Sequence, residues 1–154
     1  MSKVTSKPDN NDMKHILLAT DGSSGAERAT DVAAGLAKTA GARLSIVTVG
    51  DNISGKEADR LARAEGNVAD ALDAIANTIL RQAKERVQSA GVSDIAVQSG
   101  WGDPAEVLIE IAKHDRPDAI VIGRRGRGRL AGLLLGSVSQ KVASLAPCIV
   151  IVVP

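Results

Sequence analysis

The chain has 154 residues and a formal net charge of +1 at pH 7, with 44% hydrophobic and 24% charged residues. These values predict one globular domain, and the nearly balanced charge argues against a general nucleic-acid or membrane surface. The single cysteine, Cys148, excludes an intrachain disulfide and a cysteine-based zinc cluster. Because the chain has one tryptophan and no Phe or Tyr, its core must consist of Val, Ile, Leu and Ala, as in a buried parallel sheet.

The N-terminal stretch differs from the rest of the chain. Residues 1–13 are polar and contain Pro8, which predicts a flexible tail ahead of a folded domain at 14–154. The stretch lacks the apolar core of a signal peptide, and no apolar run in the sequence reaches the length of a transmembrane span. We therefore expect a cytoplasmic protein with no membrane contact.

Strand and helix signals alternate through the first half of the chain. They predict a buried strand at 15–20, a helix from Ser24 to about Ala40, a strand at 43–49 and a helix capped by Asn67 and stopped by Gly91. Ser24 and Glu27 form a capping-box pattern, and Gly41 is a stop signal. Residues 55–65 leave two possibilities open, a backward extension of the Asn67 helix or a mobile flap.

The second half continues the same alternation. A weaker strand at 95–98 shows some polar alternation, which suits a sheet edge. Asp103 and Pro104 start a helix that ends near His114. A strand at 118–122, a helix at about 137–145 and a strand from Cys148 to Val153 complete the pattern. Strands alternating with helices of crossover length predict an α/β domain with a parallel sheet, helices on both faces and ligands at the carboxyl ends of the strands.

The segment from 118 to 141 carries the clearest functional signal. An apolar strand is followed by Gly123, Gly126, four loop arginines, and then Gly136 and Ser137 at the start of a helix. Glycines allow a ligand to approach the backbone closely, and the first amides of a helix favour anions. The lysine of a P-loop and the third glycine of a dinucleotide fingerprint are both missing. We interpret this segment as a phosphate-binding loop of another kind.

Gly123, Gly126, Gly136 and Ser137 fit the pattern G-x2-G-x9-G-(S/T), and in this the chain resembles the nucleotide-binding branch of the universal stress protein family. The resemblance covers about residues 14–154. It implies a five-stranded sheet of the adenine nucleotide alpha hydrolase type with strand order 3-2-1-4-5. Strands one and four would then be neighbours, and Asp21 would face Gly123 across the crevice between them.

The resemblance also implies a set of ATP-binding residues. Gly123, Gly126, Gly136, Ser137 and Val138 would hold the phosphates. Thr20 and Asp21 follow the first strand, where the family keeps an acid that contacts the nucleotide or its Mg²⁺, so Asp21 is the metal candidate. The main chain at Val49 would hold the adenine edge.

Each of these residues also has a structural alternative. Asp21 would shape its turn through an Asx-type hydrogen bond, and the Val49 side chain would belong to the core. Ser137 and Gln140 match a capping box. We expect Arg125 or Arg127 to touch phosphate; a solvated loop is the alternative, and the absence of interleaved aromatics argues against a nucleic-acid patch. Trp101 would shield an adenine or, our preferred interpretation, pack on a partner subunit.

The last strand bears on oligomeric state. Cys148–Val153 carries no charge, and the resemblance places it at the sheet edge, where strands are exposed to pairing. We expect a homodimer in which this strand pairs with its two-fold copy. Leu133, Leu134 and Leu135 would join that contact or fold back on the core.

The expected function is that of a dimeric, nucleotide-dependent sensor in stress adaptation, acting on an unknown client protein. Two alternatives stay open: a slow ATPase that relies on a metal-activated water near Asp21, and a protein-binding adaptor that keeps the loop without using nucleotide. No residue is placed by motif as a general base or nucleophile, so we predict no catalytic residue.

Overall fold

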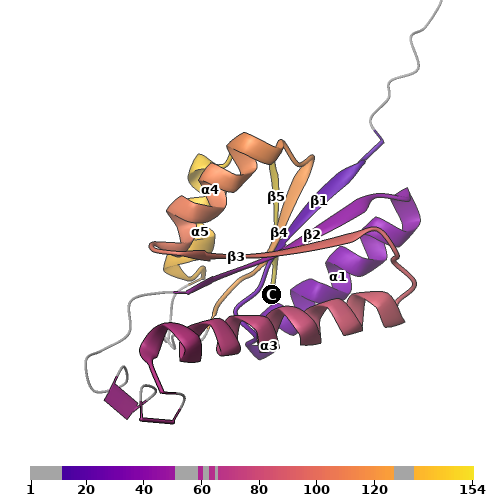
Figure 1. Ribbon diagram of the computed structural model, residues 1–154. Coiled ribbons are helices and arrows are strands. Elements are labelled where there is room, and N and C mark those ends of the chain that lie inside the picture. The colour runs from indigo at the N-terminus through magenta and orange to yellow at the C-terminus, as the bar shows by residue number, and fades with distance from the viewer. Residues whose placement is uncertain (1–11, 51–58, 61–62, 65, 127–133) are drawn as a thin grey trace, which may run out of the picture.

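The structure is a computed structural model that describes residues 12–50, 59–60, 63–64, 66–126 and 134–154. Its elements, in chain order, are β1 (His15–Ala19), α1 (Ser24–Ala40), β2 (Arg43–Gly50), α3 (Val68–Ser89), β3 (Ile95–Trp101), α4 (Pro104–Asp115), β4 (Ala119–Gly123), α5 (Ser137–Leu145) and β5 (Ile149–Val153). The strands form one parallel sheet in the order β3-β2-β1-β4-β5 (Figure 1). The predicted α/β class and the strand order 3-2-1-4-5 are confirmed.

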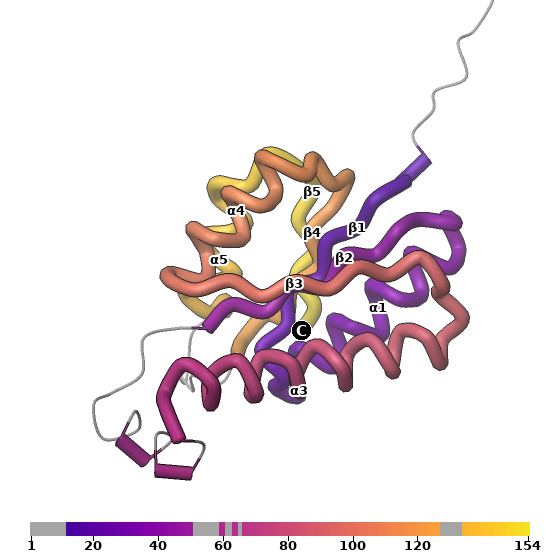
Figure 2. The backbone as a smooth tube through the Cα atoms, viewed as in Figure 1, coloured from indigo at the N-terminus to yellow at the C-terminus, as the bar shows by residue number. Residues whose placement is uncertain are grey.

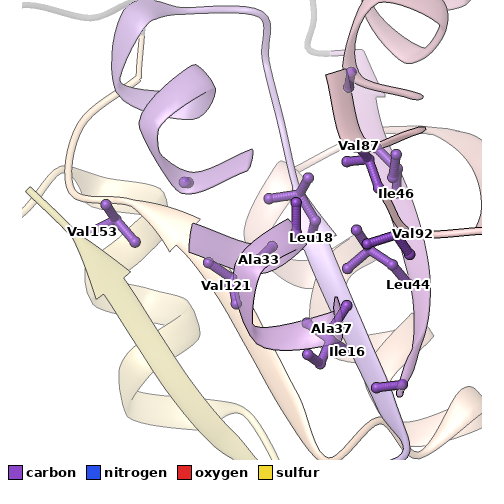
Figure 3. Close-up of a cluster of buried hydrophobic side chains, with 14 of the residues drawn as sticks. Ile16, Leu18, Ala33, Ala37, Leu44, Ile46, Val87, Val92, Val121 and Val153 are labelled. Atoms are coloured by element: carbon purple, nitrogen blue, oxygen red, sulfur yellow. The ribbon is translucent and has the colours of Figure 1, made fainter. Parts of the chain in front are cut away.

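The central strands are apolar on both faces because each face carries a hydrophobic cluster. Ile16 and Leu18 of β1 point into one cluster, which α1 and α3 cover (Figure 3). Leu17, between them, points into the second cluster, which α4 and α5 cover. All three side chains are completely buried. This arrangement explains why the sequence of the first strand shows no polar alternation.

Most helices begin or end at the capping residues that the sequence predicted. Asn67 caps α3, its Oδ1 accepting the Asp70 N–H at 2.7 Å, and Asp103 caps α4 in the same way with the N–H of Glu106 at 2.9 Å. Gly41 ends α1 in the left-handed conformation, with φ of 64°. Among the described helices, none has the length and apolar character that a membrane crossing requires.

One prediction about a helix start is wrong, and one of the alternatives left open before α3 is excluded. The N-cap of α1 is Ser23, whose Oγ accepts the Ala26 N–H at 3.2 Å, so the capping box of Ser24 and Glu27 does not form. The backbone of Asn67 is extended, and Gly66 has φ of 88°, so α3 does not extend backwards past Val68. Most of residues 51–65, including the possible flap, lie outside the described residues.

The carboxyl edge of the sheet is stepped. Pairing of β1 with β2 ends at Ala19 and Val47, whereas β2 and β3 stay paired as far as Gly50 and Trp101. Figure 2 shows the course of β2 and β3 through the sheet. The third strand is therefore longer than its predicted range of 95–98. At about 3.3 Å per residue, β2 and β3 project roughly 10 Å beyond the end of β1. The step forms a ledge beside the β1 and β4 ends, and we refer to residues 48–50 and 99–101 as the β2–β3 ledge.

Candidate functional site

The ends of β1 and β4 lie next to each other in the middle of the sheet. From these ends the chain enters α1, which packs on one face, and leads to α5, which packs on the other (Figure 1). A point at which neighbouring connections diverge to opposite faces is the usual ligand site of an open parallel sheet. The turn after β1 and the glycine loop after β4 therefore form the floor of the candidate site.

Asp21 lies in the turn after β1 and faces the glycine loop that follows β4. Its Oδ1 accepts the Ser23 N–H at 2.9 Å, so the Asx-type turn is present. The other oxygen faces the glycine loop, because a Cβ built on Gly126 would lie 2.5 Å from Asp21 Oδ2. Thr20 is held in the same turn, its hydroxyl accepting the Gly22 N–H at 3.2 Å. The structure thus brings Asp21 to the loop, as the crevice between strands one and four predicted.

Close backbone packing, and not an unusual backbone angle, explains the first glycine of the motif. Neither Gly123 nor Gly126 has a positive φ. A Cβ on Gly123 would lie 3.0 Å from the carbonyl carbon and oxygen of Gly25, and a Cβ on Gly25 would lie 2.8 Å from the carbonyl oxygen of Arg125. The start of α1 and the glycine loop therefore touch through their main chains. Gly25, which the sequence reading passed over, is part of this contact.

The two halves of the motif are joined through Arg124. Its carbonyl oxygen accepts the Gly136 N–H at 2.8 Å and the Ser139 hydroxyl at 2.8 Å, so the loop closes on itself at the start of α5. The Arg124 N–H donates to the carbonyl of Val153 at 2.6 Å, which ties the loop to β5. Ser139 is 2% exposed and was not predicted; a serine two residues after the motif is a weak signal by itself.

The start of α5 differs from the predicted capping box. Gly136 is the N-cap, and no side chain caps this end of the helix. Ser137 is the first helical residue and is exposed, so Ser137 and Gln140 form no capping box. Val138 packs partly against the second cluster. The first amides of the helix keep their capacity to bind an anion.

Val49 lies on the β2–β3 ledge, and its side chain agrees with the core alternative for this position. Its side chain packs against the second cluster. The Val47 carbonyl accepts the Thr20 N–H at 2.9 Å and therefore faces β1, and the period of two in a strand turns the Val49 main chain to the same side. Ladder pairing of β1 has ended at that level. Within the described residues, no neighbouring strand bonds the Val49 N–H and C=O on that side.

Trp101 packs within its own chain. A Cβ on Gly50 would collide with the six-membered ring of the indole, so the ring lies over Gly50 of the neighbouring strand. The side chain is still 45% exposed. The ring contacts β2, and because part of it is accessible, the expected packing on a partner subunit stays a prediction.

The structure describes only some of the arginines that were predicted to contact phosphate. Arg125 belongs to the described loop and contributes the carbonyl next to Gly25, whereas Arg127 and Leu133 lie outside the described residues. Among the described residues, no three His, Cys, Asp or Glu side chains are grouped to hold a metal. A metal at Asp21 would therefore depend on ligand oxygens for most of its coordination.

The other single residues have structural contacts. His15 Nε2 lies 2.7 Å from the hydroxyl of Ser45, and His114 Nδ1 lies 2.7 Å from Asp115 Oδ1. Cys148 precedes β5, which starts at Ile149, and burial raises the pKa of its thiol. It lines a cavity of about 350 Å³ with Lys113, Arg116 and other residues, none of which belongs to the predicted site.

The sheet edge at β5 is apolar and accessible. Ile149 is 59% exposed, and Leu145 at the end of α5 is 57% exposed. Leu134, at 76% exposed, does not fold back on the core. An apolar edge strand with free ladder positions is a surface on which another strand can pair.

Comparison with known proteins gives the family. Residues 13–154 match the model of the universal stress protein family. A Thermus aquaticus universal stress protein, encoded in the QAH/OAS sulfhydrylase 3' region, is 34% identical over 143 residues, covering 91% of this chain and 98% of that protein. Among solved structures, the universal stress protein UspA from Lactobacillus plantarum superposes with a TM-score of 0.77 at 26% identity, covering 92% and 98% of the two chains. A universal stress protein in complex with cAMP superposes with a TM-score of 0.72 at 33% identity, covering 93% and 98%. The chain is a member of the universal stress protein family.

Proposed function

We propose that this universal stress protein binds ATP at the carboxyl edge of its sheet and acts as a dimeric, nucleotide-dependent sensor in stress adaptation. The observation that carries the proposal is the closure of the glycine loop on Arg124. It brings the uncapped start of α5 back to the loop that faces Asp21. Main-chain amides and the positive end of a helix are the groups that bind phosphate oxygens.

The proposed phosphate contacts are the main-chain N–H groups of Gly126 and Val138 and the hydroxyl of Ser137. Gly123 and Gly136 would contribute by shaping the loop and by leaving space for the phosphates, since the Gly136 N–H is already bonded to the Arg124 carbonyl. Gly126 is exposed, and its lack of a side chain leaves room for the Asp21 carboxylate. Arg125 or Arg127 would add a guanidinium to the phosphates. Ser137 is well suited because its side chain is exposed and does not cap the helix.

Adenine is the base that fits the Val49 main chain. A backbone N–H and C=O on one residue offer a donor and an acceptor side by side, and the amino group and ring nitrogen of adenine offer the complementary pair. In guanine, the corresponding edge has an acceptor and a protonated ring nitrogen, which reverses the pattern. The ligand of the solved relative in complex with cAMP contains the same base, which supports an adenine nucleotide. Among adenine nucleotides we choose ATP because the loop between Gly126 and Gly136 is long.

A divalent cation would complete the site. The Asp21 carboxylate lies beside the loop on which we place the phosphates, and two negative groups so close together would repel each other without a cation. Mg²⁺ commonly binds one or two carboxylates together with phosphate oxygens and water. The same arrangement favours the second candidate function, a slow ATPase in which the metal activates a water near Asp21.

The dimer would form through β5. Pairing this strand with its two-fold copy would cover Ile149 and Leu145 and continue the sheet across two chains. Because the Arg124 N–H is bonded to Val153 at the end of β5, loop and interface would be in direct contact. Such a contact would allow nucleotide occupancy to alter the surface offered to a client protein. The cytoplasmic location expected from the sequence stays a prediction.

One experiment separates these functions. Purified protein is denatured, and any released nucleotide is identified by mass spectrometry, followed by incubation with MgATP for hours. Release of ATP and a constant ratio of ADP to ATP support the sensor, and steady ADP production supports the ATPase. If no nucleotide is released and added ATP does not bind, the proposal is wrong and the adaptor function is supported instead.

A further inference from the structure

The Trp101 side chain lies over the end of β2 and is not part of the buried hydrophobic core. The indole comes from the edge strand β3 and reaches inward, toward the centre of the sheet, because its six-membered ring lies over Gly50. Only a glycine permits this position, since a Cβ on residue 50 would overlap the ring. Two residues at the tip of neighbouring strands therefore depend on each other for this arrangement.

The rest of the turn fixes the same geometry. The Gly102 N–H donates to the Gly50 carbonyl at 3.1 Å, which holds the turn after β3 against β2. A Cβ on Gly100 would lie 2.7 Å from Cγ1 of Val107, so α4 packs directly on this turn. The indole is therefore attached to a rigid part of the fold, because β3 pairs with β2 and α4 packs against Gly100.

The indole lies over the residue that follows the base position of the proposed nucleotide site. Gly50 follows Val49, whose main-chain N–H and C=O face the gap above β1. Gly50 pairs with Trp101 and directly follows Val49, so a base bound at the Val49 main chain would lie about one residue's rise, roughly 3.3 Å, from the ring along the strand. The side chain, the only aromatic one in the sequence, is 45% exposed, so part of the ring is accessible for stacking.

We propose that Trp101, held over Gly50, is a specificity-determining residue of the nucleotide site and stacks on the purine base of the bound nucleotide. This inference rests on the proposed nucleotide function and adds to it. Stacking on an indole distinguishes a large planar base from a phosphate chain or a ribose alone. The expected ligand class is therefore a purine nucleotide, with the Val49 main chain selecting adenine among purines.

The test uses the full chain and the fluorescence of its single tryptophan. MgATP is titrated into nucleotide-free protein, and binding is measured in parallel by calorimetry. We expect ATP to change the emission of Trp101 in proportion to occupancy. Inorganic tripolyphosphate, which has the phosphates without the base, is expected to leave the emission unchanged even where calorimetry detects its binding.

Variants make the test quantitative. Trp101→Leu should weaken ATP affinity about tenfold or more, since stacking of a base on an aromatic side chain is worth about 1–3 kcal/mol, and Trp101→Phe should recover part of the loss. Tripolyphosphate affinity should stay the same in all three proteins. Val97→Ala is the matched control, because Val97 is an apolar residue of the same strand that is 43% exposed and lies outside the β2–β3 ledge.

Two results would overturn the inference, and they are distinguishable. If ATP binds by calorimetry while Trp101 emission is unchanged and Trp101→Leu keeps full affinity, the stacking role is wrong and the nucleotide function stands. If neither ATP nor tripolyphosphate binds to any of the proteins, the nucleotide function itself is wrong, and the inference falls with it.

Discussion

The carboxylate of Asp21 lies against the backbone of Gly126, so that a Cβ on residue 126 would stand 2.5 Å from Oδ2. These two residues belong to loops that follow different strands, and their approach depends on β1 and β4 being neighbours. The glycine therefore serves the contact with the acid as well as any contact with a ligand. This relationship gives the proposed site its first direct test.

Gly126→Ala should reduce ATP affinity by at least about tenfold, equivalent to about 1.4 kcal/mol. The new methyl group would push the Asp21 carboxylate away from its position and disturb both the metal site and the loop. Stability should change by less than about 1 kcal/mol, because the atom displaced is the end of a side chain. Calorimetry of Gly126→Ala, Asp21→Ala and the double variant should show non-additive effects; strictly additive losses would mean that the two residues act independently.

Gly25→Ala and Gly123→Ala should both lower the free energy of unfolding, by about 1–3 kcal/mol each. Each methyl group would meet main-chain atoms, at 2.8 Å from the Arg125 carbonyl and at 3.0 Å from Gly25, and a backbone yields less easily than a side chain. Urea denaturation measures the effect. Unchanged stability in both variants would show that α1 and the glycine loop are not in main-chain contact.

Gly35→Ala, also in α1, should have the opposite sign. No atom lies within 4 Å of a Cβ built at this position, and glycine in a helix interior is less favourable than alanine by about 0.5–1 kcal/mol. The same denaturation experiment should therefore show a stabilised protein with unchanged ATP affinity. A loss of stability here would mean that the packing around α1 is tighter than the structure shows.

Ser139→Ala and Ser137→Ala should separate structure from binding. Ser139 is buried and donates to the Arg124 carbonyl at 2.8 Å, so its removal should cost about 1–2 kcal/mol of unfolding free energy. Ser137 is exposed, and its removal should leave stability almost unchanged and weaken ATP binding. Equal effects of the two substitutions on both stability and affinity would contradict the division of roles.

Stability at acid pH should depend on Asp118. Its Oδ2 accepts the main-chain N–H groups of His15, at 2.9 Å, and Lys14, at 2.7 Å, and these bonds lower the pKa of Asp118 from 3.8. A lowered folded-state pKa gives stability that is present above the unfolded value and is lost as the pH falls through the folded one. Urea denaturation from about pH 6 to pH 2 should show this loss, reduced in Asp118→Asn. An identical acid slope in the variant would exclude this contribution.

Local signals in the sequence placed the elements, but contacts between distant residues decided the details of the site. Asn67, Asp103 and Gly41 act through their own backbone neighbours, so their roles were predicted correctly. The strand order came from the family resemblance, since no single strand carries it. The capping boxes at Ser24 and Ser137 were wrong because each helix has its N-cap one residue earlier than the pattern implies, at Ser23 and Gly136.

Residues that act across the sheet were missed or misread for the same reason. Gly25 is important only because Arg125 lies 2.8 Å from its Cβ position, and Ser139 only because Arg124 folds back over the start of α5. The contact of Trp101 with Gly50, 51 positions earlier by residue number, was also not predicted. None of these contacts leaves a periodic pattern in the sequence.

The most direct test of the account is a calorimetric titration of MgATP into nucleotide-free wild-type protein and into Gly136→Val. A valine at this position would crowd the Arg124 carbonyl, which lies 3.3 Å from the Cβ position, and would block the approach of phosphates to the start of α5. We predict one ATP bound per wild-type chain and no measurable binding to the variant, with the same circular dichroism for both. Binding of ATP to Gly136→Val with wild-type affinity, or no binding to either protein, would contradict the placement of the phosphates.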